Sequence, residues 1–151
     1  MKRLLLLIFI LLLTACSNDT LPNLSSEYIL SVINKEVTFD NAVQENLKEQ
    51  SVAERYGISP KNIENGVVYY TKDEDKSDKI IIVKASSKDT IESIERALSS
   101  EIVGISDSWK DNDKEMKKIE KHIFKTKDIY VIMAISNDAK KIEKIFDNCF
   151  K

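Results

Sequence analysis

The sequence has few of the residues that build tight turns, disulfides or metal sites. Its 151 residues include only 3 Gly, 2 Pro, 2 Cys and one His. The scarcity of Gly and Pro excludes collagen-like and proline-rich chains. Two Cys cannot form a disulfide framework, and a single histidine, His122, excludes most histidine-based triads and metal sites. The net charge of −2 gives no reason to expect a nucleic-acid partner.

What is present is the composition of an ordinary globular protein. Hydrophobic residues make up 42% and charged residues 32% of the chain, and the length suits one domain. The chain has no P-loop, no G-x-S-x-G, no C-x-x-C and no S-x-x-K motif. We therefore predict no enzyme activity and no cofactor.

The N-terminus has the layout of a secretory signal peptide. Lys2 and Arg3 precede ten apolar residues, 4–13, which are fewer than the roughly 20 that span a bilayer. Leu13-Thr14-Ala15-Cys16 follows, and this order of a hydrophobic residue, two small residues and Cys resembles the lipobox of bacterial lipoproteins. The resemblance implies cleavage before Cys16 and a diacylglyceryl cysteine carrying palmitate-like chains. The alternative is a plain signal peptide with a chance Cys, or an uncleaved anchor.

These features predict three parts of the chain. Residues 1–15 are the lipoprotein signal peptide, 16–26 the lipidated Cys and a flexible tether, and 27–150 a single α+β domain. Two acyl chains hold a protein stably on a membrane, whereas one binds only marginally. The mature chain would carry 21 basic and 25 acidic side chains, and this charge of −4 does not attract it to anionic lipid. The predicted location is the extracytoplasmic face of the cell membrane.

The apolar pattern after residue 26 alternates between helical and strand-like spacing. It predicts helices at 27–33, 40–56 (with or without a break near Ser51), 89–104 and 137–150. It predicts strands at 67–71, 79–85, 119–126 and 129–135, and a charged connector at 107–115. Gly57 is expected to end the second helix.

Two ββα units, 67–104 and 118–150, predict the arrangement of the domain. They favour a four-stranded, mainly antiparallel sheet with two helices on one face and the preceding N-terminal helices on part of the other, an α+β fold. The strands around residues 80–83 and 129–135 are apolar on both faces, which indicates a covered central position. The repeat is either a cryptic duplication or a coincidence of spacing.

Three segments, together with the lipobox, carry a resemblance to a family. They are Arg55-Tyr56-Gly57-Ile58-Ser59-Pro60, the strand 79–84 and the segment 130–136. Over roughly residues 27–150 the chain resembles the small domain-of-unknown-function lipoproteins of low-GC Gram-positive bacteria. The excess of Lys (20) over Arg (3) agrees with such a source. The resemblance brings no catalytic residue with it.

The candidate binding residues are the aromatics Trp109, Tyr69 and Tyr70. Trp109 in the charged connector is either an exposed binding residue or folds back over the sheet. His122 is predicted to be a surface residue of a strand. Cys149 is predicted to be a buried small hydrophobe on the last helix.

Two acidic stretches, 73–75 and 111–115, look like calcium loops but fail the EF-hand pattern. Asp78 or Met116 stands where Gly is needed, and Lys84 or His122 stands where a bidentate Glu is needed. We predict solvated turns and no metal site, with weak calcium binding as the alternative.

The sequence thus predicts a membrane-anchored, non-catalytic binding or accessory module of the cell envelope. It would contact the membrane through the lipid on Cys16, and an unknown envelope protein or wall polymer through its domain. One alternative is a small substrate-binding lipoprotein of a transporter, although 136 mature residues are few for a two-lobed clamshell. An envelope enzyme is the less favoured alternative.

Overall fold

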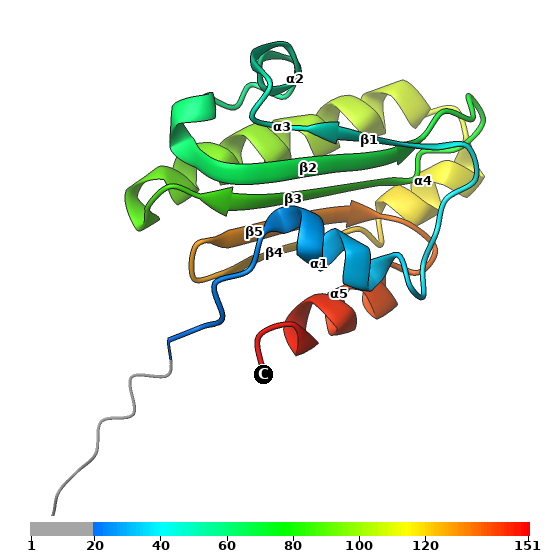
Figure 1. The fold of residues 1–151 in the computed structure, drawn as a ribbon. Helices are drawn as coiled ribbons and strands as arrows, with labels where there is room; N and C mark the ends of the chain where they lie inside the picture. The colour runs from blue at the N-terminus through cyan, green and yellow to red at the C-terminus, as the bar shows by residue number, and fades with distance from the viewer. Residues whose placement is uncertain (1–19) are drawn as a thin grey trace, which may run out of the picture.

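The computed structural model describes residues 20–151, so the predicted signal peptide and Cys16 lie outside it. In chain order the elements are α1 (Ser26–Ile33), β1 (Ala42–Asn46), α2 (Gln50–Arg55), β2 (Ile63–Thr71), β3 (Lys79–Ala85), α3 (Ile91–Trp109), α4 (Asp113–Ile119), β4 (Ile123–Lys127), β5 (Tyr130–Ile135) and α5 (Ala139–Asn148), with short 3₁₀ turns at Pro60–Asn62 and Lys88–Thr90 (Figure 1). None of the helices in this part of the chain has the length and hydropathy of a membrane span.

The fold is α+β, built on one antiparallel sheet. The strand order is β1-β2-β3-β5-β4, so the sheet has five strands where the sequence predicted four. β3 and β5 are central, with Ile81 opposite Met133 and Ile82 opposite Ile132. Their side chains are buried on both faces, as their continuous apolar runs predicted.

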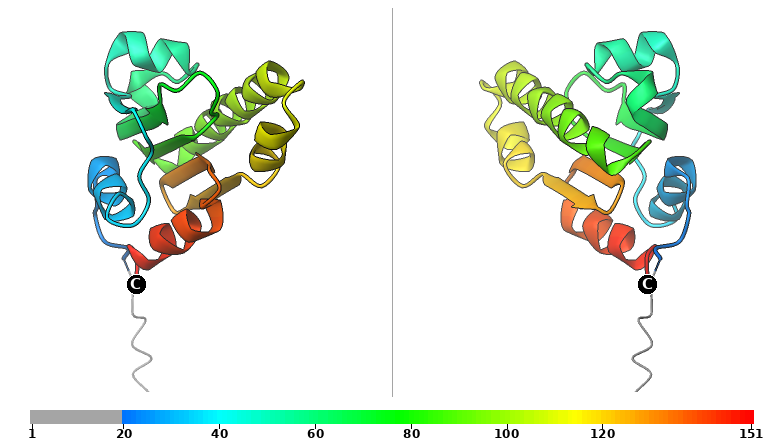
Figure 2. Two further views of the ribbon diagram at one scale, coloured as in Figure 1. Left: turned by 90° about the vertical axis from the view of Figure 1, so that its right-hand side faces the viewer. Right: turned by 90° about the vertical axis from the view of Figure 1, so that its left-hand side faces the viewer.

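Helices cover both faces of this sheet (Figure 2). α1 and α5 pack on the face that carries Ile80, Ile82 and Ile132. α3, with α2 beside it, packs on the face that carries Ile81 and Val83. The prediction that both ββα helices share one face is therefore wrong. Because β3 and β5 are apolar on both faces, each face requires its own cover.

The structure contains both predicted ββα units in chain order, as β2-β3-α3 and β4-β5-α5. Their central strands, β3 and β5, are antiparallel neighbours. A twofold axis normal to the sheet would relate such units and would place both helices on the same face. Since α3 and α5 lie on opposite faces, the units are not symmetry-related copies. The repeat is therefore one of element order and not of three-dimensional arrangement.

The prediction that the segment 40–56 is helical holds only for its end. Ala42–Asn46 instead pairs with residues 67–71 of β2 and forms the fifth strand, at the sheet edge. Only Val43 and Leu47 supported the helical spacing there, and pairing with a distant strand overrode this weak preference. The helix α2 occupies the end of the segment. Gly57 follows it with a φ of 64°, which confirms the predicted glycine stop.

The predicted connector 107–115 is also helical. α3 continues past Gly104 to Trp109, and α4 begins directly after Asn112, whose side chain accepts a hydrogen bond from the Glu115 N–H (3.2 Å). This cap and the acidic first turn stabilise a short helix. Because α4 runs to Ile119, β4 begins later than predicted, and His122 lies in the turn before it rather than in a strand.

A buried ion-pair network joins α4 to the loop between β2 and β3. The Lys118 ammonium lies 2.7 Å from both the Asp78 and the Glu115 carboxylates. Ser77 donates its N–H (2.8 Å) and its hydroxyl (2.7 Å) to Glu115, whose residue is 1% exposed. Burial tends to raise the pKa of Glu115, but the hydrogen bonds from Lys118 and Ser77 outweigh it and hold the pKa below its ordinary value. The second acidic stretch thus ends in a structural ion pair.

Candidate functional site

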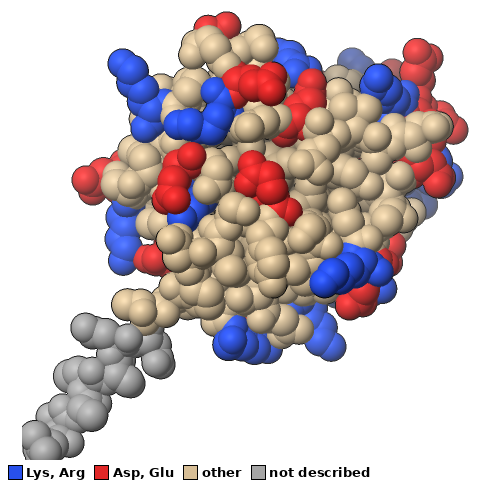
Figure 3. Space-filling model, viewed as in Figure 1, with Lys and Arg blue, Asp and Glu red and all other residues tan. Residues whose placement is uncertain are grey.

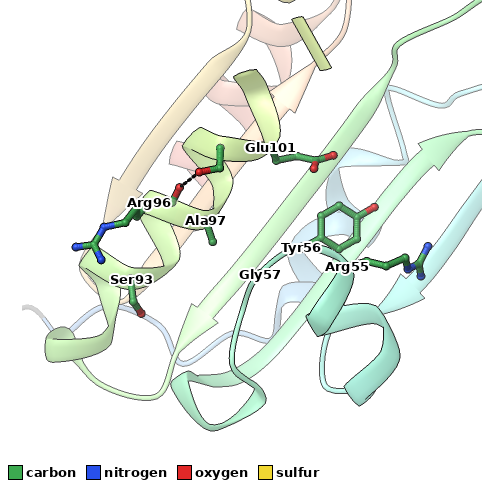
Figure 4. A pocket seen from close by; sticks show the side chains of 8 residues that line it. Arg55, Tyr56, Gly57, Ser93, Arg96, Ala97 and Glu101 are labelled. Carbon is green, nitrogen blue, oxygen red and sulfur yellow. Dashed lines mark hydrogen bonds between the residues drawn. The ribbon is translucent and has the colours of Figure 1, made fainter. Parts of the chain in front are cut away.

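A hollow with a volume of about 520 Å³ lies between the end of α2 and the first half of α3. Its walls are Arg55, Tyr56, Gly57, Ser93, Arg96, Ala97, Ser100 and Glu101 (Figure 4). In this view the Tyr56 ring stands between Glu101 and Arg55, and the Arg96 guanidinium points away from it. The left-handed turn at Gly57 lets the chain turn directly after Tyr56, so that ring stays against α3.

Lys79 lies beside this hollow, next to two of its lining residues, Tyr56 and Glu101. Its ammonium lies 5.3 Å from the centroid of the Tyr56 ring and 5.8 Å from that of Tyr70, within cation–π range of both. It also pairs with the Glu101 carboxylate at 2.6 Å. One strand residue thereby links α2, α3 and the sheet.

A second, smaller hollow of about 160 Å³ lies further along α3. It is lined by Tyr70, Thr71, Lys76, Ser77, Lys79, Ile105 and Trp109. We call the two hollows together the α2–α3 groove. From α3, Ser93, Arg96, Ala97, Ser100 and Glu101 line the first hollow, and Ile105 and Trp109 line the second. The stretch of α3 from Ser93 to Trp109 is about 24 Å long at 1.5 Å per residue.

The charges of the groove are balanced. Arg55 pairs with Glu45 (2.7 Å), Arg96 with Glu92 (2.8 Å) and Lys79 with Glu101 (2.6 Å). Burial, with the nearby carboxylates of Glu101 and Glu45, raises the pKa of Tyr56 above its ordinary value. The phenol therefore stays protonated and can donate a hydrogen bond, while the aromatic rings offer stacking surfaces.

The structure brings two of the three candidate aromatics together. Trp109 and Tyr70 line the same hollow. Tyr69 points to the opposite face of the sheet, as alternation along a strand requires. There its ring stacks on Phe39 with centroids 5.0 Å apart, and its hydroxyl accepts a hydrogen bond from the Phe39 N–H (3.3 Å).

Sequence reasoning missed Tyr56, Lys79 and Glu101, which form the centre of the groove. Lys79 opens a strand opposite Tyr70, so both side chains lie on one face. The four-residue spacing from Glu101 to Trp109 was a second available signal. Neither signal shows that α3 packs on this face rather than on the other.

The remaining candidates lie elsewhere. The His122 ring Nδ1 is 2.7 Å from the Ile119 carbonyl oxygen, an arrangement within its own turn. Cys149 is half-buried on the α1 and α5 side, where burial raises the pKa of its thiol. Asp73, in the first acidic stretch, accepts hydrogen bonds from Lys76 (2.8 Å) and Asn41 (2.5 Å). Within residues 20–151, no cluster of His, Cys, Asp and Glu has the geometry of a metal site.

A family model of a domain of unknown function, DUF4358, matches residues 37–136. The chain belongs to this family. The match runs from the segment before β1 to the end of β5, so it includes both walls of the α2–α3 groove and leaves out α1 and α5. Comparison with curated proteins and with solved structures gives no match.

Proposed function

We propose that the protein is a membrane-anchored extracytoplasmic lipoprotein whose domain is a non-catalytic binding module that uses the α2–α3 groove. The single observation that supports the binding role is the cluster of Tyr56, Tyr70 and Trp109 around the Lys79–Glu101 ion pair. Support for the anchor comes from the lipobox-like sequence that ends at Cys16.

The shape and charge of the groove favour an extended, polar ligand. The groove consists of two hollows that follow one another along α3, and it presents aromatic rings beside paired charges. Aromatic residues and Arg are the residue types that supply most binding energy at protein interfaces. Because each cation of the groove already has a carboxylate partner, a strongly charged ligand would have to displace one of these ion pairs. An uncharged segment of an envelope protein or wall polymer could bind without displacing any ion pair.

The arrangement also favours binding over catalysis. Covalent catalysis needs a nucleophile held beside a base, with a third group that orients the base. Of the serines of the groove, Ser93 and Ser100 donate to the backbone carbonyls of Thr90 and Arg96. Ser77 donates to the Glu115 carboxylate, whose low pKa makes it a weak base. The raised pKa of Tyr56 makes it a poor general base.

The binding role can be tested by photocrosslinking in the native cell. A benzophenone amino acid replaces Ala97, which lines the groove, or Val103, which is 61% exposed elsewhere on α3. We expect one defined adduct from position 97 and none from position 103. The Tyr56→Ala and Trp109→Ala variants should lose that adduct while remaining folded. Equal adducts from both positions, or an adduct that survives both substitutions, would contradict the proposed groove.

The anchor is tested separately by intact mass and membrane fractionation of wild type and Cys16→Ala. A mature chain that begins at Cys16 and carries a diacylglyceryl group, with both features lost in the variant, is the expected result. An unlipidated chain of equal mass in both preparations would refute the anchor and leave the groove hypothesis standing.

A further inference from the structure

We propose that the outer face of the α1 and α5 layer lies on an anionic lipid surface and fixes the orientation of the domain. This face, the α1–α5 face, comprises a groove lined by Leu24, Tyr28, Val32, Glu36, Ile145, Asn148 and Cys149, and the exposed Lys140 and Lys144 of α5 with Lys151 after it. The inference rests on the proposed lipidation of Cys16.

The first argument is the short length of chain between the proposed lipid and the folded domain. Tyr130 holds the segment that leads into α1: its hydroxyl accepts from the Leu24 N–H (2.9 Å) and lies within hydrogen-bond distance of the Leu24 (2.9 Å) and Pro22 (3.3 Å) carbonyl oxygens. Leu21 packs against the same core. Only five residue steps separate Leu21 from Cys16, which span at most about 18 Å. The α1–α5 layer must therefore stay close to the headgroups.

The second argument is the apolar character of this face. The groove between α1 and α5 has a volume of about 330 Å³. Tyr28 at its rim is 54% exposed, so its ring is available to the interfacial region where Tyr side chains are favoured. Figure 3 shows a broad uncharged area over α1 and α5 that reaches the place where the described chain begins.

The third argument is the local charge. Lys140 and Lys144 lie on the side of α5 opposite its core residues, and Lys151 is exposed just after the helix. None of the three pairs with a carboxylate among residues 20–151. The acidic residues of the same helix, Glu143 and Asp147, are held by Lys125 at 3.2 and 2.7 Å. The helix therefore presents net positive charge outward, although the mature chain as a whole is acidic. Lys side chains at an anionic surface each favour association by several-fold.

The experiment compares the two most exposed apolar side chains, which lie on opposite layers. In the lipidated chain with Cys149→Ser, a nitroxide is attached at Tyr28→Cys or at Val103→Cys. The protein is placed on phosphatidylglycerol-containing vesicles. We measure collisions with a water-soluble nickel complex and with oxygen, which concentrates in lipid. We expect the label at 28 to be several-fold less accessible to nickel and more accessible to oxygen than the label at 103.

Charge reversal provides the matched control. Lys140→Glu/Lys144→Glu/Lys151→Glu should shift the docked state toward the free state by at least about 100-fold, because loss of three Lys at about 1 kcal/mol each gives that shift and the new carboxylates add repulsion. Lys110→Glu/Lys114→Glu/Lys117→Glu, three exposed positions on the α3–α4 side, should change nothing. On pure phosphatidylcholine vesicles, which have no anionic lipid, the wild-type chain should lose docking as the first triple variant does.

The outcomes separate this inference from the proposed function. Equal nickel accessibility at 28 and 103, in a chain whose mass shows the lipid, would overturn the orientation and leave the anchor intact. A label at 28 shielded from both nickel and oxygen in native membranes would overturn lipid as the occupant in favour of a protein. A chain without the lipid would overturn the anchor itself and the orientation with it.

Discussion

The buried network around Lys118 makes the sharpest stability prediction. Lys118→Met removes the ammonium and leaves the Glu115 and Asp78 carboxylates without their cation in a site where Glu115 is 1% exposed. Removing one partner of a buried ion pair costs about 3–5 kcal/mol. We expect the lower end, about 3 kcal/mol, because Ser77 still donates two hydrogen bonds to Glu115. For a domain of this size that is a fall in Tm of about 10 °C.

Urea unfolding of four variants tests this reasoning. The matched control is Lys117→Met, an exposed neighbour on the same helix, which should change stability by less than about 0.5 kcal/mol. The double variant Glu115→Gln/Lys118→Met should lose less than the sum of the two single losses, since each single change strands the other charge. Additive losses would refute the argument that the stranded charge carries the cost.

The same network predicts that the free energy of unfolding falls at acid pH. The pKa of Glu115 is depressed in the folded state, so the unfolded chain binds more protons between the two pKa values. The stabilisation is complete above the ordinary pKa, about 4.3, and is lost as the pH falls through the folded pKa. The stability of Glu115→Gln should therefore depend less on pH than that of wild type below about pH 5. A fall at acid pH that is unchanged in this variant would contradict the assignment.

Three further predictions concern other parts of the chain. Tyr130→Phe should cost about 1–2 kcal/mol and speed hydrogen exchange at the Leu24 amide, because the hydroxyl that holds that segment is lost. Gly66→Ala should cost about 1–3 kcal/mol in urea unfolding, because an added Cβ would lie 3.0 Å from both Cβ and Cδ1 of the buried Leu47. Cys149 should react with iodoacetamide more slowly in the folded chain than in urea, since burial raises its pKa and lowers the thiolate fraction.

Controls for these variants are available in the chain. Tyr28→Phe removes an exposed hydroxyl and should leave the Leu24 amide unaffected. Gly104→Ala lies in the middle of α3 with open space around it and should stabilise by up to about 1 kcal/mol. A loss at Gly104 as large as that at Gly66 would show that close approach to Leu47 is not the cause.

The elements that could be predicted from the sequence are those with a strong local signal. β3 and β5 are continuous β-branched and apolar runs, and the structure places them at the centre of the sheet. β1 could not be predicted, because the segment Ala42–Asn46 has few apolar residues. It forms a strand only by pairing with residues 67–71. The side of the sheet on which a helix packs has no local signal either, since both faces of β3 are equally apolar.

The candidate site shows the same division. That Tyr69 and Tyr70 face opposite ways follows from strand alternation alone. That Trp109 meets Tyr70 depends on α3 running to its full length over the β2–β3 side of the sheet. The predicted lipidation of Cys16 lies outside the described residues and stays a prediction.

The layer order gives the two proposed surfaces separate tasks. The α1–α5 face and the α2–α3 groove lie on opposite sides of one sheet. Packed layers are about 10 Å apart. With the first face on the lipid, the groove would open away from the membrane, roughly two layers, or about 20 Å, above it. Such a division of roles requires a central sheet with helices on both faces. The α1–α5 layer can then be adapted to the membrane and the α2–α3 layer to a ligand, with no residue shared between the two surfaces. The family match, which spans the groove but omits α1 and α5, agrees with this separation.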